Sequence, residues 1–215
     1  MASFLKQNKL VQRAEQEFID MLDLGYDMFS LATETLAENK PPEIVKDFEV
    51  LDKKINKKHR DVRKKLYEHL SMSGGKDLFS SLVLLSVVDD SERIGDYTKN
   101  IAEILAHLSQ FYIDDYQDDF LEILNKTDKR FLQTKKAFID QDEALAESLV
   151  QNYKNQSQQC NALLTSLLTT SENMKRDDVA LALLVRYLKR ISAHLKNIAS
   201  AVVNPYHRIG YKVKK

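Results

Sequence analysis

The sequence has few residues that interrupt or cross-link regular structure: its 215 residues include five glycines, three prolines, one cysteine and no tryptophan. This scarcity of glycine and proline excludes a β-sandwich or β-barrel, because such folds need a turn about every 8–12 residues. The single Cys160 excludes both a disulfide framework and a zinc site built from cysteines. The charges balance, with 32 Lys and Arg against 32 Asp and Glu, so we expect no nucleic-acid partner.

Long apolar runs and catalytic sequence motifs are also missing. The most apolar run, residues 78–88, contains three serines and is too short to cross a bilayer, which takes about 20 residues. The N-terminus lacks the layout of a signal peptide, and no phosphate-binding loop, GxGxxG, GxSxG or HExxH occurs. We therefore expect a cytoplasmic protein that does not insert into a membrane and is not an enzyme.

Apolar residues recur at helical spacing along most of the chain, and prolines and glycines separate these segments. Pro41 and Pro42 break the first segment, Gly74 and Gly75 end the second, and Pro205 closes the last. The sequence thus predicts an all-α protein of six helices joined by short turns, at about 4–39, 42–70, 77–110, 116–138, 142–168 and 177–203.

A motif in the third expected helix returns in the sixth. Five residues recur in register 97 residues later: Arg93, Ile94, Asn100, Ile101 and Ala102 become Arg190, Ile191, Asn197, Ile198 and Ala199. A shared period of this length indicates duplication of a three-helix unit. We therefore expect two tandem three-helix bundles, residues 1–112 and residues 113–215.

Four carboxylates share one face of the third helix at positions i, i+3, i+7 and i+14: Asp89, Glu92, Asp96 and Glu103. Like charges three or four residues apart repel by about 0.2–0.5 kcal/mol per pair on an exposed helix, and a bound cation would reverse that cost. The second copy keeps no acid at these positions, which are Arg186, Lys189, Ala193 and Ser200. A metal site of this kind is therefore expected only in the first bundle.

Residues 89–103, with the sequence DDSERIGDYTKNIAE, resemble the signature of the PhoU family of phosphate-uptake regulators. That signature sets an acid-x-x-x-Asp element within a Glu-Arg-Ile-Gly-Asp and Asn-Ile-Ala-Glu run, once per three-helix repeat. The resemblance implies a non-enzymatic cytoplasmic regulator that restrains phosphate uptake, built from two three-helix bundles and forming a homodimer. It also implies contacts with a phosphate ABC transporter or its sensor histidine kinase, and several family members bind iron or zinc clusters.

The resemblance assigns candidate metal ligands as well. Glu92 and Asp96 match the acid-x-x-x-Asp pair of the third helix, and Asp52 matches the leading acid of the second helix. Asp89 belongs to the same stripe, and Glu49 on the second helix is a spare ligand. Carboxylate oxygens suit hard cations, and iron or zinc is the metal that the resemblance implies.

This sequence departs from the family pattern in ways that bear on the metal. Asn56 stands where the family usually has the second acid of the second helix, although His59 on the same face is another possible ligand. Residues 151–156 of the fifth helix contain no acid. The alternative to a metal site is a solvated acidic stripe that pairs with neighbouring lysines.

Other functions fit parts of the pattern. PhoU-like modules also form the cytosolic part of sodium/phosphate cotransporters, and residues 204–211 (NPYHRIGY) resemble those proteins as much as the free-standing regulators. A generic helical-bundle interaction protein without a phosphate link is a further alternative. A ferritin-like di-iron oxidase is not expected, because it needs two Glu-x-x-His elements and Glu103 and His107 are four residues apart.

The remaining polar features have structural interpretations. His194 falls on the apolar seam of the sixth helix, where we expect a bond to a neighbouring backbone group, and Cys160 is expected to be buried and inert. The many Lys and Arg of residues 53–65 form either a docking face for an acidic partner or membrane surface, or a solvated helix face. A second basic patch would pair with acids of a dimer mate or hold an anion: Arg186, Lys189, Arg190 and Lys196.

Overall fold

The computed structural model describes residues 9–38, 45–108, 111, 113–170 and 175–213. Six long α-helices account for most of them: α1 (Lys9–Glu38), α2 (Val45–Met72), α3 (Leu78–Ala106), α4 (Gln117–Asp140), α5 (Glu143–Thr170) and α6 (Arg176–Val203). Two short 3₁₀ turns, η3 (Asp114–Tyr116) and η4 (Tyr206–Arg208), precede α4 and follow α6. The all-α fold and the six helices predicted from the sequence are confirmed. Parts of three expected helices lie outside the described residues: residues 4–8 and 39 of the first, 42–44 of the second and 109–110 of the third.

Local backbone chemistry explains where the helices end. Gly74 and Gly75 adopt φ values of 60° and 89°, and this left-handed turn ends α2. Gln141 has φ 51° and closes α4 in the same way. Helix α3 was expected to reach residue 110 but ends at Ala106, because the N–H of His107 bonds the Ile104 carbonyl at 3.0 Å and tightens the last turn.

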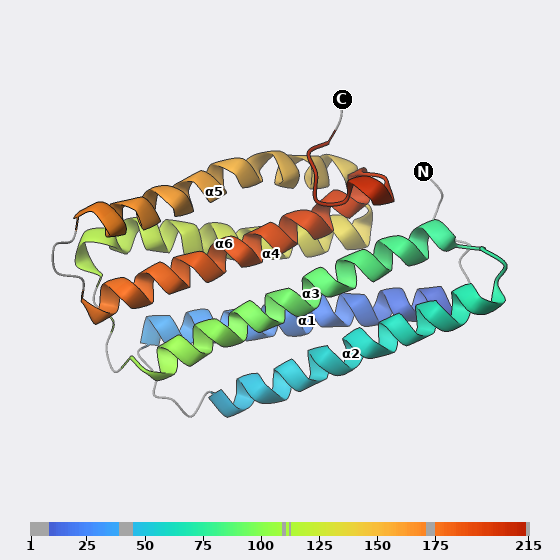
Figure 1. The fold of residues 1–215 in the computed structure, drawn as a ribbon, viewed down its shortest axis with the longest axis horizontal. Coiled ribbons are helices and arrows are strands. Elements are labelled where there is room, and N and C mark those ends of the chain that lie inside the picture. Colours follow the sequence, from blue (N-terminus) through green and yellow to red (C-terminus); the bar gives the residue numbers. More distant parts are fainter. Residues whose placement is uncertain (1–8, 39–44, 109–110, 112, 171–174, 214–215) are drawn as a thin grey trace.

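The helices form two three-helix bundles that lie side by side, with all six helices running along the long axis of the molecule (Figure 1). Helices α1, α2 and α3 pack against one another, and so do α4, α5 and α6. The two bundles are joined mainly by α3 against α6 and less extensively by α1 against α4 and α3 against η4. None of the described helices is long and apolar enough to span a bilayer.

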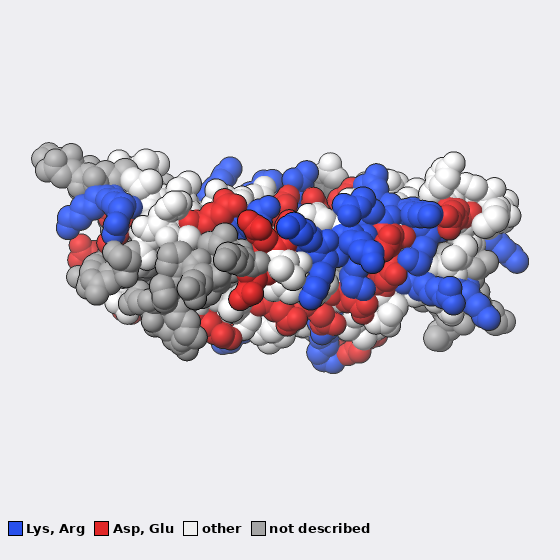
Figure 2. All heavy atoms as spheres, turned by 90° about the horizontal axis from the view of Figure 1, so that it is seen from below, with Lys and Arg blue, Asp and Glu red and all other residues white. Residues whose placement is uncertain are grey.

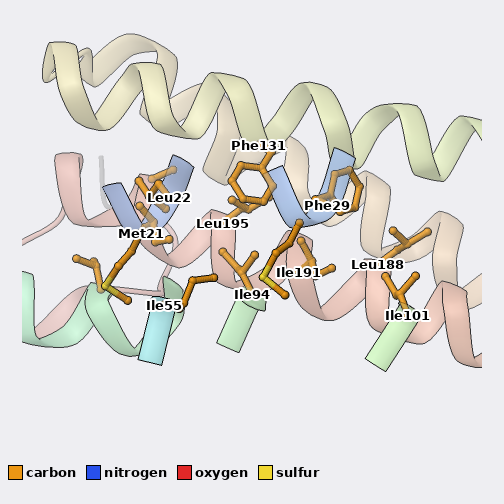
Figure 3. Close-up of a cluster of buried hydrophobic side chains, with 14 of the residues drawn as sticks. Met21, Leu22, Phe29, Ile55, Ile94, Ile101, Phe131, Leu188, Ile191 and Leu195 are labelled. Atoms are coloured by element: carbon orange, nitrogen blue, oxygen red, sulfur yellow. The ribbon is translucent and has the colours of Figure 1, made fainter. Parts of the chain in front are cut away.

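One hydrophobic core runs through both three-helix units. Figure 3 shows Ile94 and Ile101 of α3 beside Leu188 and Ile191 of α6, all buried. Aromatic side chains connect the units at the α1–α4 contact, where the Phe18 and Phe138 ring centroids lie 4.8 Å apart and those of Tyr26 and Phe131 lie 5.3 Å apart. The duplicated units are therefore packed into a single core, while the boundary at residue 112/113 stays a prediction.

Candidate functional site

The acidic stripe of α3 lies along its contact with α2, and a glycine sets how close the two helices come. A Cβ atom at Gly95 would lie only 3.1 Å from Cδ1 of the buried Ile55 on α2. Glycine at this position lets the helix backbones approach closely. The neighbouring Glu92 and Asp96 are consequently half-buried, with 21% and 31% of their side chains exposed.

The N-terminal end of the stripe is bound by His59 and Arg63 of α2. An oxygen of the Asp89 carboxylate lies 2.7 Å from His59 Nε2 and accepts a hydrogen bond from Arg63 Nη1 at 2.8 Å. This carboxylate is 54% exposed, so water screens the ion pair and its contribution to stability is small. His59, a spare ligand in the sequence prediction, thus serves as a partner of Asp89.

The negative charges in the middle of the stripe, Glu92 and Asp96, are paired with Arg93 of the same helix. Arg93 Nη1 donates to Asp96 Oδ2 at 3.0 Å, and Arg93 Nε lies 3.6 Å from Glu92 Oε2. One guanidinium therefore neutralises two carboxylates on adjacent turns.

The predicted ligands of α2 are also engaged. Asp52 lies 3.6 Å from Lys99 Nζ of α3 and accepts a hydrogen bond from Asn56 Nδ2 at 3.0 Å. Asn56 stands where the family usually has the second acid of this helix, and its amide binds the leading acid, Asp52. Glu49 is exposed and lies 4.0 Å from Lys53 of its own helix.

These positions decide how well the predicted ligands suit a metal. The structure brings Asp89, Asp96 and His59 within electrostatic reach of Glu92. In the described part of the chain, however, no group of three or more His, Cys, Asp or Glu side chains is arranged to hold a metal ion. As placed, the carboxylates bind Arg and Lys side chains, so the arrangement does not fit a resident iron or zinc centre.

Glu92 is the member of the stripe whose ionisation is perturbed. Burial raises the pKa of Glu92, the charge of Asp96 raises it further, and Arg93 and His59 oppose the shift. A carboxyl group with a raised pKa in the folded state favours folding only while it is protonated. Folding stability is therefore lost as the pH rises from the ordinary pKa of glutamate through the raised value of Glu92.

Glu92→Gln is expected to make the protein more stable than the wild type at pH 7, because glutamine keeps the shape and removes the buried charge. The advantage should shrink as the pH falls and vanish below about pH 4, where a carboxyl group is protonated in both states. Urea unfolding at several pH values measures this difference, with Glu103→Gln on an exposed part of α3 as the control. A Glu92→Gln protein less stable than the wild type at pH 7 would contradict this account of the stripe.

A second polar cluster joins the two units where α3 crosses α6. Asp90 is only 9% exposed, and one of its carboxylate oxygens lies 2.7 Å from His194 Nδ1 and 2.9 Å from Asn197 Nδ2. Tyr97 stacks on the His194 ring with centroids 5.7 Å apart. Arg190 donates from Nε to the Tyr97 hydroxyl at 3.1 Å. The expectation that His194 binds a backbone group is wrong, because its partner is the Asp90 side chain.

Asp90 is a residue of this cluster that the sequence analysis did not single out. It occupies an apolar seam position of α3, between Val87 and Ile94. A carboxylate in such a row must find a hydrogen-bond donor when it is buried. Its donors come from more than 100 residues away in the sequence.

The predicted basic features are largely used within the chain. Lys189 Nζ donates to Asn161 Oδ1 at 2.5 Å, and Lys196 Nζ donates to the Gly210 carbonyl at 2.5 Å. Figure 2 shows the Lys and Arg side chains along α2 interleaved with Asp and Glu, and Lys58 pairs with Asp20 at 2.7 Å. Cys160 is fully buried as expected, and burial raises the pKa of its thiol to about 11. Both features favour an unreactive thiol, which stays a prediction.

Comparisons with known proteins match both three-helix units. A family model of the PhoU domain matches residues 18–105 and again residues 120–202. The chain is 24% identical over 197 residues to the phosphate-specific transport system accessory protein PhoU homolog of Synechocystis sp., covering 89% of this chain and 87% of that protein.

Solved structures share the architecture. The crystal structure of PhoU from Pseudomonas aeruginosa matches with a TM-score of 0.82 at 21% identity, over 90% of this chain and 95% of that one. The phosphate transport system regulatory protein PhoU from Streptococcus pneumoniae matches with a TM-score of 0.80 at 20% identity, over 95% of this chain and 98% of that one. At these identities the likeness establishes the fold.

Proposed function

Because the chain belongs to the PhoU family, we propose that it is a cytoplasmic regulator that restrains phosphate uptake. The observation that carries the proposal is the double match of the PhoU domain, once for each three-helix unit. The family is one of regulatory proteins and not of enzymes. A regulator that catalyses no reaction has to act by binding other molecules.

We infer that the partners are a phosphate ABC transporter, its sensor histidine kinase, or both. Support comes from the Synechocystis relative, whose name assigns it to a phosphate-specific transport system, at 24% identity over most of both chains. The mixed charge along α2 favours a partner with charges of both signs over a uniformly anionic membrane, because Asp and Glu interrupt its Lys and Arg. The homodimer implied by the resemblance stays a prediction.

A bound metal would act in this regulation through the predicted ligands of the first unit. The assignment of these ligands stays a prediction: Glu92, Asp96, Asp89, Asp52 and Glu49. Their present contacts to Arg and Lys side chains argue against a resident metal. Metal analysis of untagged protein beside a Glu92→Ala/Asp96→Ala double variant separates the two cases. Equal metal content in both proteins supports a charge-paired stripe, and a loss of metal only in the variant supports ligation.

Deletion of the gene is expected to switch on phosphate-starvation genes in cells grown at high phosphate, because the restraint on uptake and signalling is lost. A transcriptional reporter for those genes measures the effect, and a plasmid copy of the wild-type gene should restore repression. Unchanged reporter activity in the deletion strain would refute the regulator and favour a helical interaction protein without a phosphate link. An adjoining membrane-spanning segment in the same reading frame would instead favour the cotransporter module.

A further inference from the structure

A pocket of about 370 Å³ lies between α4 and α5 on the second three-helix unit. Its size is in the range of sites that bind small molecules. Three cationic side chains and several amides line it, and no Asp or Glu is among its described lining residues. The principal members are Lys126, Lys129, Arg130, Asn152, Asn155 and Gln156.

Arg130 is the buried charge of this pocket. Only 6% of the residue is exposed, and its hydrogen bonds go to neutral groups: Nε donates to Gln156 Oε1 at 2.8 Å and Nη1 to the Leu149 carbonyl at 2.7 Å. Its guanidinium also lies 5.8 Å from the centre of the Tyr153 ring. Burial lowers the pKa of Arg130 to about 10, and no carboxylate opposes the shift. A buried cation without an anion is costly, so the pocket favours the arrival of one.

A hydrogen-bond network fixes Arg130 in place. Gln156 accepts from Arg130 and donates from Nε2 to Thr127 Oγ1 at 2.9 Å. Thr127 Oγ1 lies 3.3 Å from Ser192 Oγ of α6. The guanidinium is thus held by two groups of α5, one of which is itself fixed by hydroxyl groups of α4 and α6, before any ligand binds, and this reduces the ordering cost of binding.

The number of pocket cations without a carboxylate partner indicates how much negative charge the ligand carries. Lys126 is already paired with Glu122, at 2.6 Å. Lys129 has no ion pair among the described residues, and Arg130 has only neutral partners. Two positive charges are left to balance, which matches a phosphate group, whose charge near pH 7 is about −1.5 to −2. A single carboxylate would neutralise only one of them.

The corresponding groove of the first unit shows the contrast. Between α1 and α2, a pocket of about 520 Å³ is lined by Lys54, Lys57 and Lys58 together with four acidic residues. One of these acids, Asp20, pairs directly with Lys58 at 2.7 Å. The chain neutralises its own cations there, whereas the α4–α5 pocket lacks the acids that would do so.

We propose that the α4–α5 pocket binds a phosphate-type dianion, either free inorganic phosphate or the phosphate group of a small metabolite. Guanidinium, ammonium and amide N–H groups are the donors that phosphate oxygens accept from most strongly. The site is separate from the acidic stripe of α2 and α3. Its ligand would give the second unit a means of responding to the phosphate level that goes beyond the proposed regulation of uptake.

Titration calorimetry on the purified full chain tests the pocket with inorganic phosphate and with adenosine monophosphate, each against potassium chloride at equal ionic strength. We expect saturable binding of at least one phosphate compound and none of chloride, and the compound that binds identifies the source. Lys129→Gln should weaken binding about tenfold, the loss of one charge-assisted contact. Arg130→Gln should abolish binding, and Lys57→Gln in the first unit should leave it unchanged.

Lys129 is exposed, so its replacement tests the site even if Arg130→Gln fails to fold. Absence of phosphate binding to the folded wild-type chain would overturn the proposal. Binding that Lys129→Gln leaves unchanged, or that Lys57→Gln weakens equally, would overturn it as well. Because binding is measured without a transporter, its failure is distinguishable from failure of the reporter test.

Discussion

Phe131→Ala is expected to lower the free energy of unfolding by about 3–5 kcal/mol, the usual cost of removing a fully buried phenylalanine. Phe131 is 1% exposed and packs across the two units, with its ring centroid 5.3 Å from that of Tyr26 and 6.0 Å from that of Phe29. Figure 3 shows it among side chains of α1, α3 and α6. Each kcal/mol corresponds to about 2–4 °C in the melting temperature of a protein of this size.

The adjacent Leu132 provides the control for Phe131, because it is 46% exposed on the same helix. Leu132→Ala should change stability by no more than about 0.5 kcal/mol. Urea unfolding of both variants measures the difference. A loss for Phe131→Ala as small as that for Leu132→Ala would show that the two units do not share a core.

Asp90→Ala is expected to cost about 2–5 kcal/mol, because it leaves His194 and Asn197 without their buried acceptor. Asp90→Asn keeps an acceptor oxygen and should cost less. The preceding residue offers a matched comparison: Asp89 also pairs with a histidine but is 54% exposed. Asp89→Ala should therefore cost no more than about 1 kcal/mol.

Thermal and urea unfolding of the Asp89 and Asp90 variants decide whether the inter-unit cluster is strong. Equal losses for Asp89→Ala and Asp90→Ala would mean that the buried contact between α3 and α6 adds nothing beyond a surface ion pair. The contact is also related to the internal repeat. The repeat pairs Asp90 with Tyr187 and Tyr97 with His194, each 97 residues apart. The counterparts of Asp90 and His194 are therefore Tyr187 and Tyr97, and their rings are also in contact, with centroids 5.9 Å apart.

The sequence was sufficient for the helices because their signals are local. Helical spacing of apolar residues and the glycines and prolines between helices predicted all six, and Gly74 and Gly75 end α2 through their positive φ angles. The apolar spacing within α3 was visible too, since Ile94 and Ile101 of the repeated motif are buried. Residues three or four apart in the sequence lie on one face of a helix, so the buried face can be predicted without knowing which helix packs against it.

Contacts between helices could not be read in the same way. The spacing of Asp89, Glu92 and Asp96 showed a shared face but not that Arg63 and Arg93 would bind them. Likewise, Arg130 stands at an inward position of α4, yet its neutral partners on α5 follow from packing. A prediction of metal ligands needs these neighbours, because a carboxylate held by a cation is a poorer ligand than its sequence position indicates.

The two units have diverged in charge while keeping their fold. Position 92 of the first copy is glutamate and its counterpart Lys189 bonds Asn161, so an acidic position has become basic. The Arg130 pocket adds cations to the same second unit. Residues 1–112 and 113–215 each contain 16 Lys and Arg, but the first segment has 19 Asp and Glu and the second only 13. A net acidic first unit and a net basic second unit suit one chain that contacts partners and anions through different surfaces.

The regulatory function is tested most directly by phosphate uptake itself. Cells of the native host grown at high phosphate, with and without the gene, would be given radiolabelled phosphate and their initial uptake rates compared. The account predicts faster uptake without the gene and a return to the wild-type rate when the gene is restored on a plasmid. Equal initial rates in the two strains would contradict the conclusion that this PhoU-family protein restrains phosphate transport.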